Sequence, residues 1–190
     1  KEFEITCLPV GKDGILDINK LEDAIRPDTI LISVMHANNE IGVIQPIKEI
    51  GALCKSKEII FHVDAAQSVG KIPLNVHDME IDLLSISAHK LYGPKGIGAL
   101  YVQRKNPRLQ LQPIIFGGGH EQGIRSGTLP VPNIVGMGRT CDIARDVMVE
   151  ENHKITNLRN QLLETIMADN PIVKVNGSIE KRLAGNLNIS

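Results

Sequence analysis

Four short, largely apolar runs constrain the fold of this chain most strongly. They cover residues 30–35, 59–61, 82–87 and 99–102. Helical patterns separate them: Asp17 can cap a short helix that ends at Pro27, and Pro46 opens a second one with apolar residues at helical spacing. Strands read as continuous apolar runs when helices cover both faces of their sheet. The pattern predicts an α/β fold, a mostly parallel sheet sandwiched by helices.

The pattern changes near Pro132, where one long helical stretch begins and continues to Asn170. We therefore expect residues 1–131 to form part of one large domain. Residues 132–190 are expected to form a long connecting helix and the beginning of a smaller C-terminal α+β domain. Because the chain begins at Lys1 and stops at Ser190 inside an apolar stretch, we expect an internal piece of a longer protein.

Charge and cysteine content exclude several kinds of partner. The chain has 21 basic and 22 acidic residues, a net charge of -1, so no electrostatic footprint for nucleic acid or an anionic membrane is visible. No apolar run approaches the roughly 20 residues of a membrane-spanning helix. Cys7, Cys54 and Cys141 are odd in number and far apart, which argues against a disulfide framework or a zinc site. A reducing compartment, such as the cytoplasm, fits best.

Polar clusters follow three of the predicted strands, at residues 36–40, 62–67 and 87–90. Ligands of open α/β sheets bind just beyond the carboxyl ends of the strands. We therefore expect these three clusters to converge on one site.

Lys90 follows an apolar strand and precedes the glycine-rich segment 93–96. A lysine is most often a solvated surface charge. At the end of a strand, however, partial burial would lower the pKa of its amine and allow it to form a Schiff base.

Asp64, Gln67 and Asn39 each have a structural and a functional interpretation. Asp64 can cap a helix after its strand, or it can hold a cationic ring nitrogen protonated. Gln67 can donate to a phenolic oxygen of the same ring. Asn39 would by default be a turn residue, since it stands beside Gly42 in a turn-forming segment.

Further phosphate-type donors flank this region. Ser87 and His89 are short donors beside Lys90, although His89 can equally be a satisfied loop residue. Arg125 and Thr128 follow the three glycines at 117–119. Those glycines fit a close approach to a ligand or another chain, or a surface hairpin.

Four segments, in their order and spacing, resemble one enzyme superfamily, the class V aminotransferases. Within it the chain is similar to the cysteine desulfurases of the iron-sulfur cluster assembly type, through essentially all of its length. Ala88 stands where glycine is usual, which we expect to be tolerated unless this residue needs a positive φ. The segments are Asn38-Asn39-Glu40-Ile41-Gly42, His62-Val63-Asp64-Ala65-Ala66-Gln67-Ser68, Ser87-Ala88-His89-Lys90-Leu91-Tyr92-Gly93-Pro94-Lys95-Gly96 and Arg125-Ser126-Gly127-Thr128.

The resemblance implies the large domain of fold type I, a homodimer, pyridoxal 5′-phosphate as cofactor and a role at each matched position. Lys90 would hold the cofactor covalently and move protons, with His89 beside it as the other catalytic residue. Asp64 would pair with the pyridine nitrogen, and Asn39 and Gln67 would flank the phenolic oxygen. Ser87 and His89 would bind the phosphate, and Thr128 would reach the phosphate of the partner subunit's cofactor.

The activity that the resemblance implies converts L-cysteine to L-alanine and passes the sulfur on as an enzyme persulfide. The recipients would be acceptor or scaffold proteins of iron-sulfur assembly and tRNA thiolation, in the cytoplasm or, in a eukaryote, the mitochondrial matrix. The family's nucleophilic cysteine lies on a C-terminal loop, and none of Cys7, Cys54 and Cys141 has its context. The family's ring-stacking histidine and substrate-binding arginine also fall outside this sequence. The 190 residues alone are therefore expected to be inactive.

Three alternatives remain at this point. The first is another class V enzyme, such as a selenocysteine lyase or a desulfurase of the sulfur-mobilisation type. The second is a metal hydrolase, since histidines and carboxylates at strand ends can ligate zinc, although this leaves Lys90 and Gln67 unexplained. Its ligands would be His62, Asp64, His89 and His120. The third is a non-catalytic piece that keeps only the cofactor-binding fold.

Overall fold

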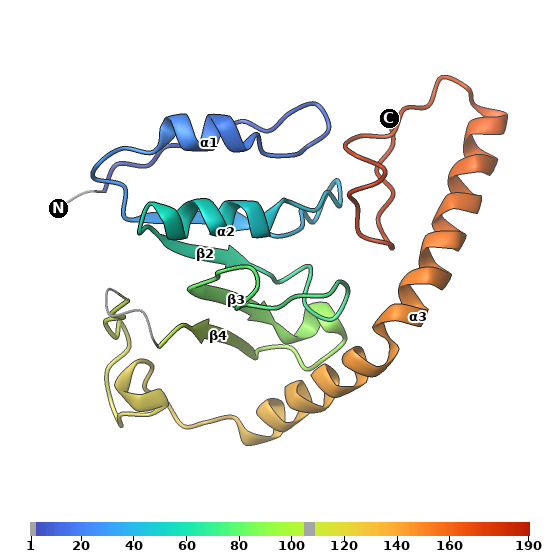
Figure 1. Ribbon diagram of the computed structural model, residues 1–190. Helices are drawn as coiled ribbons and strands as arrows, with labels where there is room; N and C mark the ends of the chain where they lie inside the picture. The colour runs from blue at the N-terminus through green and yellow to red at the C-terminus, as the bar shows by residue number, and fades with distance from the viewer. Residues whose placement is uncertain (1–2, 105–108) are drawn as a thin grey trace.

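A four-stranded sheet forms the centre of the computed structural model, which describes residues 3–104 and 109–190. Its strands lie in chain order, β1 (Leu31–Met35), β2 (Ile60–Asp64), β3 (Leu83–Ser87) and β4 (Gly98–Val102). β1, β2 and β3 are parallel, and β4 is antiparallel to β3. The prediction of a mostly parallel sheet with helices is confirmed (Figure 1).

The antiparallel direction of β4 follows from the short connection before it. Only residues 88–97 join β3 to β4, including the single 3₁₀ turn η1 (Ala88–Leu91). A parallel crossover needs a dozen or more residues, usually with a helix, so this connection can only reverse the chain. Tyr92 helps the reversal by adopting a left-handed backbone conformation with φ of 65°.

Two helices pack on one face of the sheet, α1 (Ile18–Ala24) and α2 (Ile47–Ser56). The Asp17 side chain caps α1 by accepting from the backbone N–H groups of Asn19 and Lys20, as predicted. Pro46 is the residue just before α2, where its missing N–H leaves no helical hydrogen bond unmade.

The core lies between these helices and the strands. Phe61 and Val63 of β2 are completely buried, and Ile47 and Ile50 of α2 are at most 2% exposed. On the other face of β1, Leu31 and Met35 are exposed. The alternation in β1 and β2 therefore gives the sheet one apolar face against the helices and one more open face.

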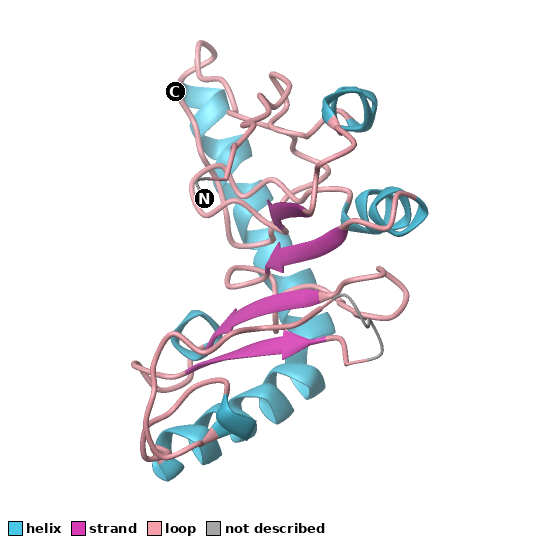
Figure 2. Ribbon diagram, turned by 90° about the vertical axis from the view of Figure 1, so that its left-hand side faces the viewer, coloured by secondary structure: helices cyan, strands magenta, loops and turns pink. Residues whose placement is uncertain are grey.

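A 39-residue helix, α3 (Val131–Asp169), follows the sheet and confirms the predicted long helix. It runs past the sheet and contacts η1 (Figures 1 and 2). Its apolar residues are only partly covered, since Leu158 and Leu162 remain more than half exposed. The division into a large domain at 1–131 and a smaller one beginning in 132–190 stays a prediction. No helix in the described ranges has the length and apolar character needed to cross a membrane.

The C-terminal residues return to the loop that follows β1. The backbone N–H of Leu183 donates to the carbonyl of Gly42, and that of Ile44 donates to the carbonyl of Lys181, each at 2.9 Å. Segments 38–44 and 176–190, far apart in sequence, are thus joined through their backbones.

Candidate functional site

The three polar clusters lie at neighbouring strand ends. The strand registers pair Met35 with Asp64 and Asp64 with Ser85. Because β1, β2 and β3 are parallel, residues 36–40, 62–67 and 87–90 all leave the sheet at its carboxyl edge. The three clusters therefore share one edge of the sheet, and their convergence on a single site stays a prediction.

Asp64 is the last residue of β2 and is half-buried. Its Oδ1 accepts from the backbone N–H of Ala66 at 2.9 Å, which is the local turn role that the sequence allowed. Its Oδ2 has no hydrogen-bond partner among the described residues. One carboxylate oxygen is therefore available for a cationic ligand.

A hydrogen-bonded row crosses the open face of the sheet beside Asp64. The Nδ1 of His62 is 2.7 Å from the hydroxyl of Ser33, and its Nε2 is 2.9 Å from the hydroxyl of Ser85. Burial lowers the pKa of His62, and the Asp64 charge opposes this only in part. The row fixes the imidazole across β1, β2 and β3. Because side chains two residues apart on a strand share a face, the His62 imidazole lies on the same face of β2 as the Asp64 carboxylate.

Lys90 lies on η1, directly beyond the end of β3. The expectation of partial burial is wrong, because the Lys90 side chain is exposed. It leaves the short η1 turn at the sheet edge, whereas the neighbouring Ala88 and Leu91 take the buried positions. The backbone of Ala88 does not have a positive φ, so alanine fits at this position without the strain that only glycine would avoid.

Ser87 and His89 lie close together beside Lys90. The Ser87 hydroxyl is 3.1 Å from the Nδ1 of His89, and the His89 side chain is exposed. A hydroxyl at the end of β3 and an imidazole two residues later on η1 are both groups that can donate to an anion.

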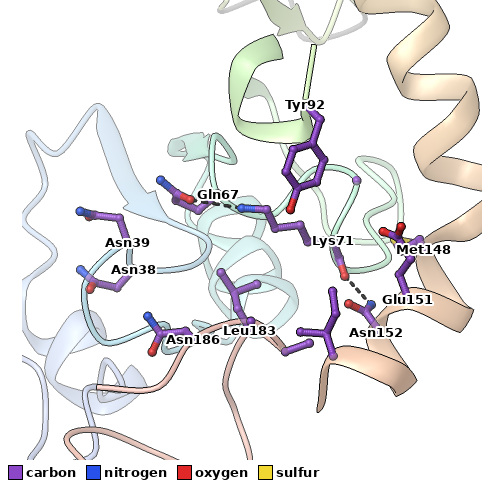
Figure 3. A pocket seen from close by; sticks show the side chains of 14 residues that line it. Asn38, Asn39, Gln67, Lys71, Tyr92, Met148, Glu151, Asn152, Leu183 and Asn186 are labelled. Atoms are coloured by element: carbon purple, nitrogen blue, oxygen red, sulfur yellow. Dashed lines mark hydrogen bonds between the residues drawn. The ribbon is translucent and has the colours of Figure 1, made fainter. Parts of the chain in front are cut away.

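A cavity of about 220 Å³ opens beside these strand ends (Figure 3). Asn39 and Gln67 line it, together with residues of α3 and of the C-terminal segment. Asn38, rather than Asn39, makes the turn: its Oδ1 accepts from the backbone N–H groups of Glu40 and Ile41, each at 2.9 Å. The Asn39 amide has no hydrogen-bond partner among the described residues and is free for a ligand.

Lys71 also lines this cavity, and the sequence interpretation missed it. Its Nζ is 3.4 Å from the Oε1 of Gln67. Burial lowers the pKa of Lys71, and the charge of Lys90 lowers it further. The signal that could have revealed it is the four-residue spacing from Gln67, which places both side chains on one side of the turn after β2.

The loop that carries Asn39 is held by the C-terminal segment. The Asn186 side-chain amide donates to the carbonyl of Glu40 at 2.8 Å, and Arg182 donates to the Oδ1 of Asn186 at 2.8 Å. Arg182 is only 6% exposed and also donates to the carbonyls of Ser178 and Asn176. The buried Arg182 guanidinium, each of whose three nitrogens donates one hydrogen bond, thus holds Asn186 against the loop that carries Asn39.

Thr128 does not join this site within the chain. It is exposed on the segment 109–130, which follows β4 at the opposite edge of the sheet (Figure 1). In that segment the Ser126 hydroxyl accepts from the backbone N–H of Gly119 at 3.2 Å, and the Nδ1 of His120 accepts from Gly127 at 3.3 Å.

Of the predicted site residues, Asn39 and Gln67 line the cavity, whereas Asp64, Ser87, His89 and Lys90 lie at the same carboxyl edge of the sheet outside its lining. Asp64 offers a carboxylate oxygen, Gln67 and Asn39 offer amides, Lys90 offers an amine, and Ser87 and His89 offer a hydroxyl and an imidazole. This set suits an aromatic cation that carries an oxygen substituent and a phosphate. Within the described parts of the chain, no three His, Cys, Asp or Glu side chains are grouped to hold a metal ion, so the proposed zinc ligands do not come together.

Comparison with known proteins places the whole chain in one family. The Aminotransferase class-V family matches residues 1–190. A relative from Glaesserella parasuis serovar 5, named cysteine desulfurase IscS, is 60% identical over 190 residues; the match covers 99% of this chain and 46% of the relative. The chain spans about half the length of the curated relatives it matches.

Solved structures share the fold. A NifS-like protein superposes with a TM-score of 0.92 at 38% identity, covering 99% of this chain and 51% of that protein. SspA in complex with cysteine superposes with a TM-score of 0.83 at 40% identity, again covering 99% and 51%.

Proposed function

Because the chain belongs to the aminotransferase class-V family, we propose that it is the cofactor-binding part of a pyridoxal-phosphate-dependent cysteine desulfurase. The observation that carries the proposal is the free Asp64 oxygen at the same strand-end edge as Lys90. A 60% identical relative is named as a cysteine desulfurase, and a similar solved protein holds cysteine.

The residues present fit pyridoxal phosphate. Asp64 would hold the pyridine nitrogen protonated, Gln67 and Asn39 would donate to the phenolic oxygen, and Ser87 with His89 would bind the phosphate. Lys90 would carry the cofactor covalently. The bound cofactor supplies an electron sink for negative charge that develops at the α-carbon of the amino acid.

Each of these residues would have a separate role in the reaction. When the cofactor is bound, the Asp64 carboxylate would favour the protonated pyridine nitrogen, and the Gln67 and Asn39 amides would hold the phenolic oxygen. Lys90 lies on the short η1 turn with its side chain exposed, so its amine, once released from the cofactor, would be able to move a proton at the substrate's α-carbon. Overall, L-cysteine would lose its sulfur to an enzyme thiolate, leaving L-alanine and an enzyme persulfide.

None of the three cysteines suits the nucleophile. Cys54 is buried in the core, and burial with the Asp82 charge raises the pKa of its thiol to about 12. Cys7 lies on the N-terminal segment and Cys141 on α3, and neither lines the cavity beside Gln67. We infer that a cysteine from another part of the polypeptide accepts the sulfur.

We further propose a homodimer. The segment before α3 exposes large apolar side chains, with Ile114 90% and Phe116 80% exposed, and a second copy of the chain would cover them. Thr128 would then reach the phosphate of the partner's cofactor.

The sulfur would pass to acceptor or scaffold proteins of iron-sulfur assembly. We place the enzyme in the cytoplasm, or in the mitochondrial matrix of a eukaryote, where exposed thiols such as Cys7 and Cys141 stay reduced.

The full-length polypeptide, supplied with pyridoxal phosphate, tests the function. With L-cysteine and a thiol reductant, it should release alanine and sulfide in equal amounts. L-selenocysteine in a parallel assay distinguishes a selenocysteine lyase, which would turn it over while leaving L-cysteine unchanged. Pyridoxal phosphate binding without turnover of either amino acid would contradict the proposed activity and leave only a cofactor-binding fold.

A further inference from the structure

The side-chain amide of Gln67 has its oxygen turned toward Lys71 and its nitrogen turned away (Figure 3). The Nζ of Lys71 lies 3.4 Å from Gln67 Oε1. An ammonium group has only donors, so it attracts the amide oxygen and repels the amide N–H groups. Of the two ways the planar amide can face, Lys71 favours the one that presents N–H groups on the side away from Lys71.

Lys71 is itself held in place. The side-chain amide of Asn152, on α3, donates to the backbone carbonyl of Lys71. The Lys71 side chain is half-buried in the wall of the cavity, and no carboxylate in the described part of the chain forms an ion pair with it. Glu151 also lines the cavity but makes no ion pair with Lys71, so the Lys71 ammonium has the Gln67 oxygen as its hydrogen-bond acceptor among the described residues.

We propose that Lys71 is a positioning residue that fixes the amide orientation of Gln67, so that Gln67 donates to the phenolic oxygen of the bound cofactor. The inference rests on the proposed function, because it needs a ligand oxygen beyond the Gln67 nitrogen. Without Lys71 the amide can turn over and present its oxygen to that electron-rich ligand atom. Lys71 acts through Gln67 and touches no reacting atom.

A double-mutant cycle isolates this effect from a general structural one. The full-length polypeptide is freed of cofactor, and the dissociation constant for pyridoxal phosphate and the absorbance maximum of the bound form are measured. The four proteins are wild type, Lys71→Met, Gln67→Ala and the double variant. Lys71→Met keeps the aliphatic stem of the side chain and removes the charge.

A hydrogen bond to a charged group contributes about 1.5–3 kcal/mol, so its loss corresponds to about 10-fold or more. Lys71→Met should weaken cofactor binding by about 10-fold and shift the absorbance maximum when Gln67 is present. In the Gln67→Ala background the same change should have less than about a 2-fold effect. Lys71→Arg, which keeps the charge, should restore both readouts.

Two controls complete the design. Lys48→Met removes a charge from the exposed side of α2 and should leave both readouts unchanged. Thermal unfolding of every variant reports on the fold. An equal loss of affinity from Lys71→Met in both backgrounds would overturn the inference, even if the wild-type enzyme is active. Failure of the wild-type protein to bind pyridoxal phosphate would overturn the proposed function and this inference together.

Discussion

Asp64, at the end of β2, is in register with Ser85 of β3, and the next backbone N–H, that of Ala65, donates to the Ser85 carbonyl at 3.0 Å. This pairing fixes the carboxylate at the sheet edge from which Ser87, His89 and Lys90 continue. A rigid strand end gives the carboxylate a more constant position than a loop could. The proposed division of roles between Asp64 and Lys90 depends on this register.

Asp64→Asn should separate chemistry from binding. The variant keeps the size of the side chain and the Oδ1 acceptor for Ala66, but it cannot hold a ring nitrogen protonated. We expect turnover of L-cysteine to fall by about 100-fold or more, with a change in the pyridoxal phosphate dissociation constant below about 10-fold. Alanine release and cofactor titration measure the two quantities. Asp78→Asn, at an exposed turn, is the control, and unchanged turnover in Asp64→Asn would contradict the assigned role.

The position of the polar clusters at the sheet edge could be predicted from the sequence, because strand burial and helix caps depend on residues close together in the chain. The Asp17 cap, the apolar runs and the polar clusters after them all report local structure and burial. The exposure of Lys90 was not predictable, because it depends on which elements cover η1. Lys71 was missed since its importance comes from a neighbour's amide rather than from its own position. The support of Glu40 by Asn186 joins residues 146 positions apart, and no local pattern encodes such a contact.

Two glycines in helices should respond to alanine in opposite directions. A Cβ at Gly51 of α2 would overlap the carbonyl oxygen of Met79, so Gly51→Ala should lower the free energy of unfolding by about 1–3 kcal/mol. A Cβ at Gly138 of α3 meets no atom within 4 Å, so Gly138→Ala should raise it by about 0.5–1 kcal/mol. Urea unfolding of both variants and of the wild type measures these changes in the free energy of unfolding. Stabilisation by Gly51→Ala would contradict the close contact between α2 and the Met79 carbonyl on which this prediction rests.

His36 should make stability depend on pH. It is 3% exposed, and burial lowers its pKa from the ordinary 6.5 to about 4. Between these values the unfolded chain binds a proton that the folded chain does not, so stability is complete above pH 6.5 and is lost as the pH falls toward 4. At 1.36 kcal/mol per pKa unit the loss amounts to about 3 kcal/mol.

His36→Gln should flatten this part of the stability profile relative to wild type. Unfolding by urea at a series of pH values between 7 and 4, roughly the range of the His36 titration, provides the comparison. His77→Gln changes an exposed histidine and should leave the wild-type slope in place. If His36→Gln and wild type lose stability in parallel, the buried His36 is not the origin of the pH dependence.

The attachment site of the cofactor tests the central claim most directly. The full-length polypeptide is loaded with pyridoxal phosphate, treated with borohydride to make the attachment permanent, digested and analysed by mass spectrometry. We predict that the pyridoxyl group is found on Lys90 and that Lys90→Ala carries none while unfolding at a similar temperature. A pyridoxyl group on Lys71 or another lysine, or on the Lys90→Ala protein, would contradict the account.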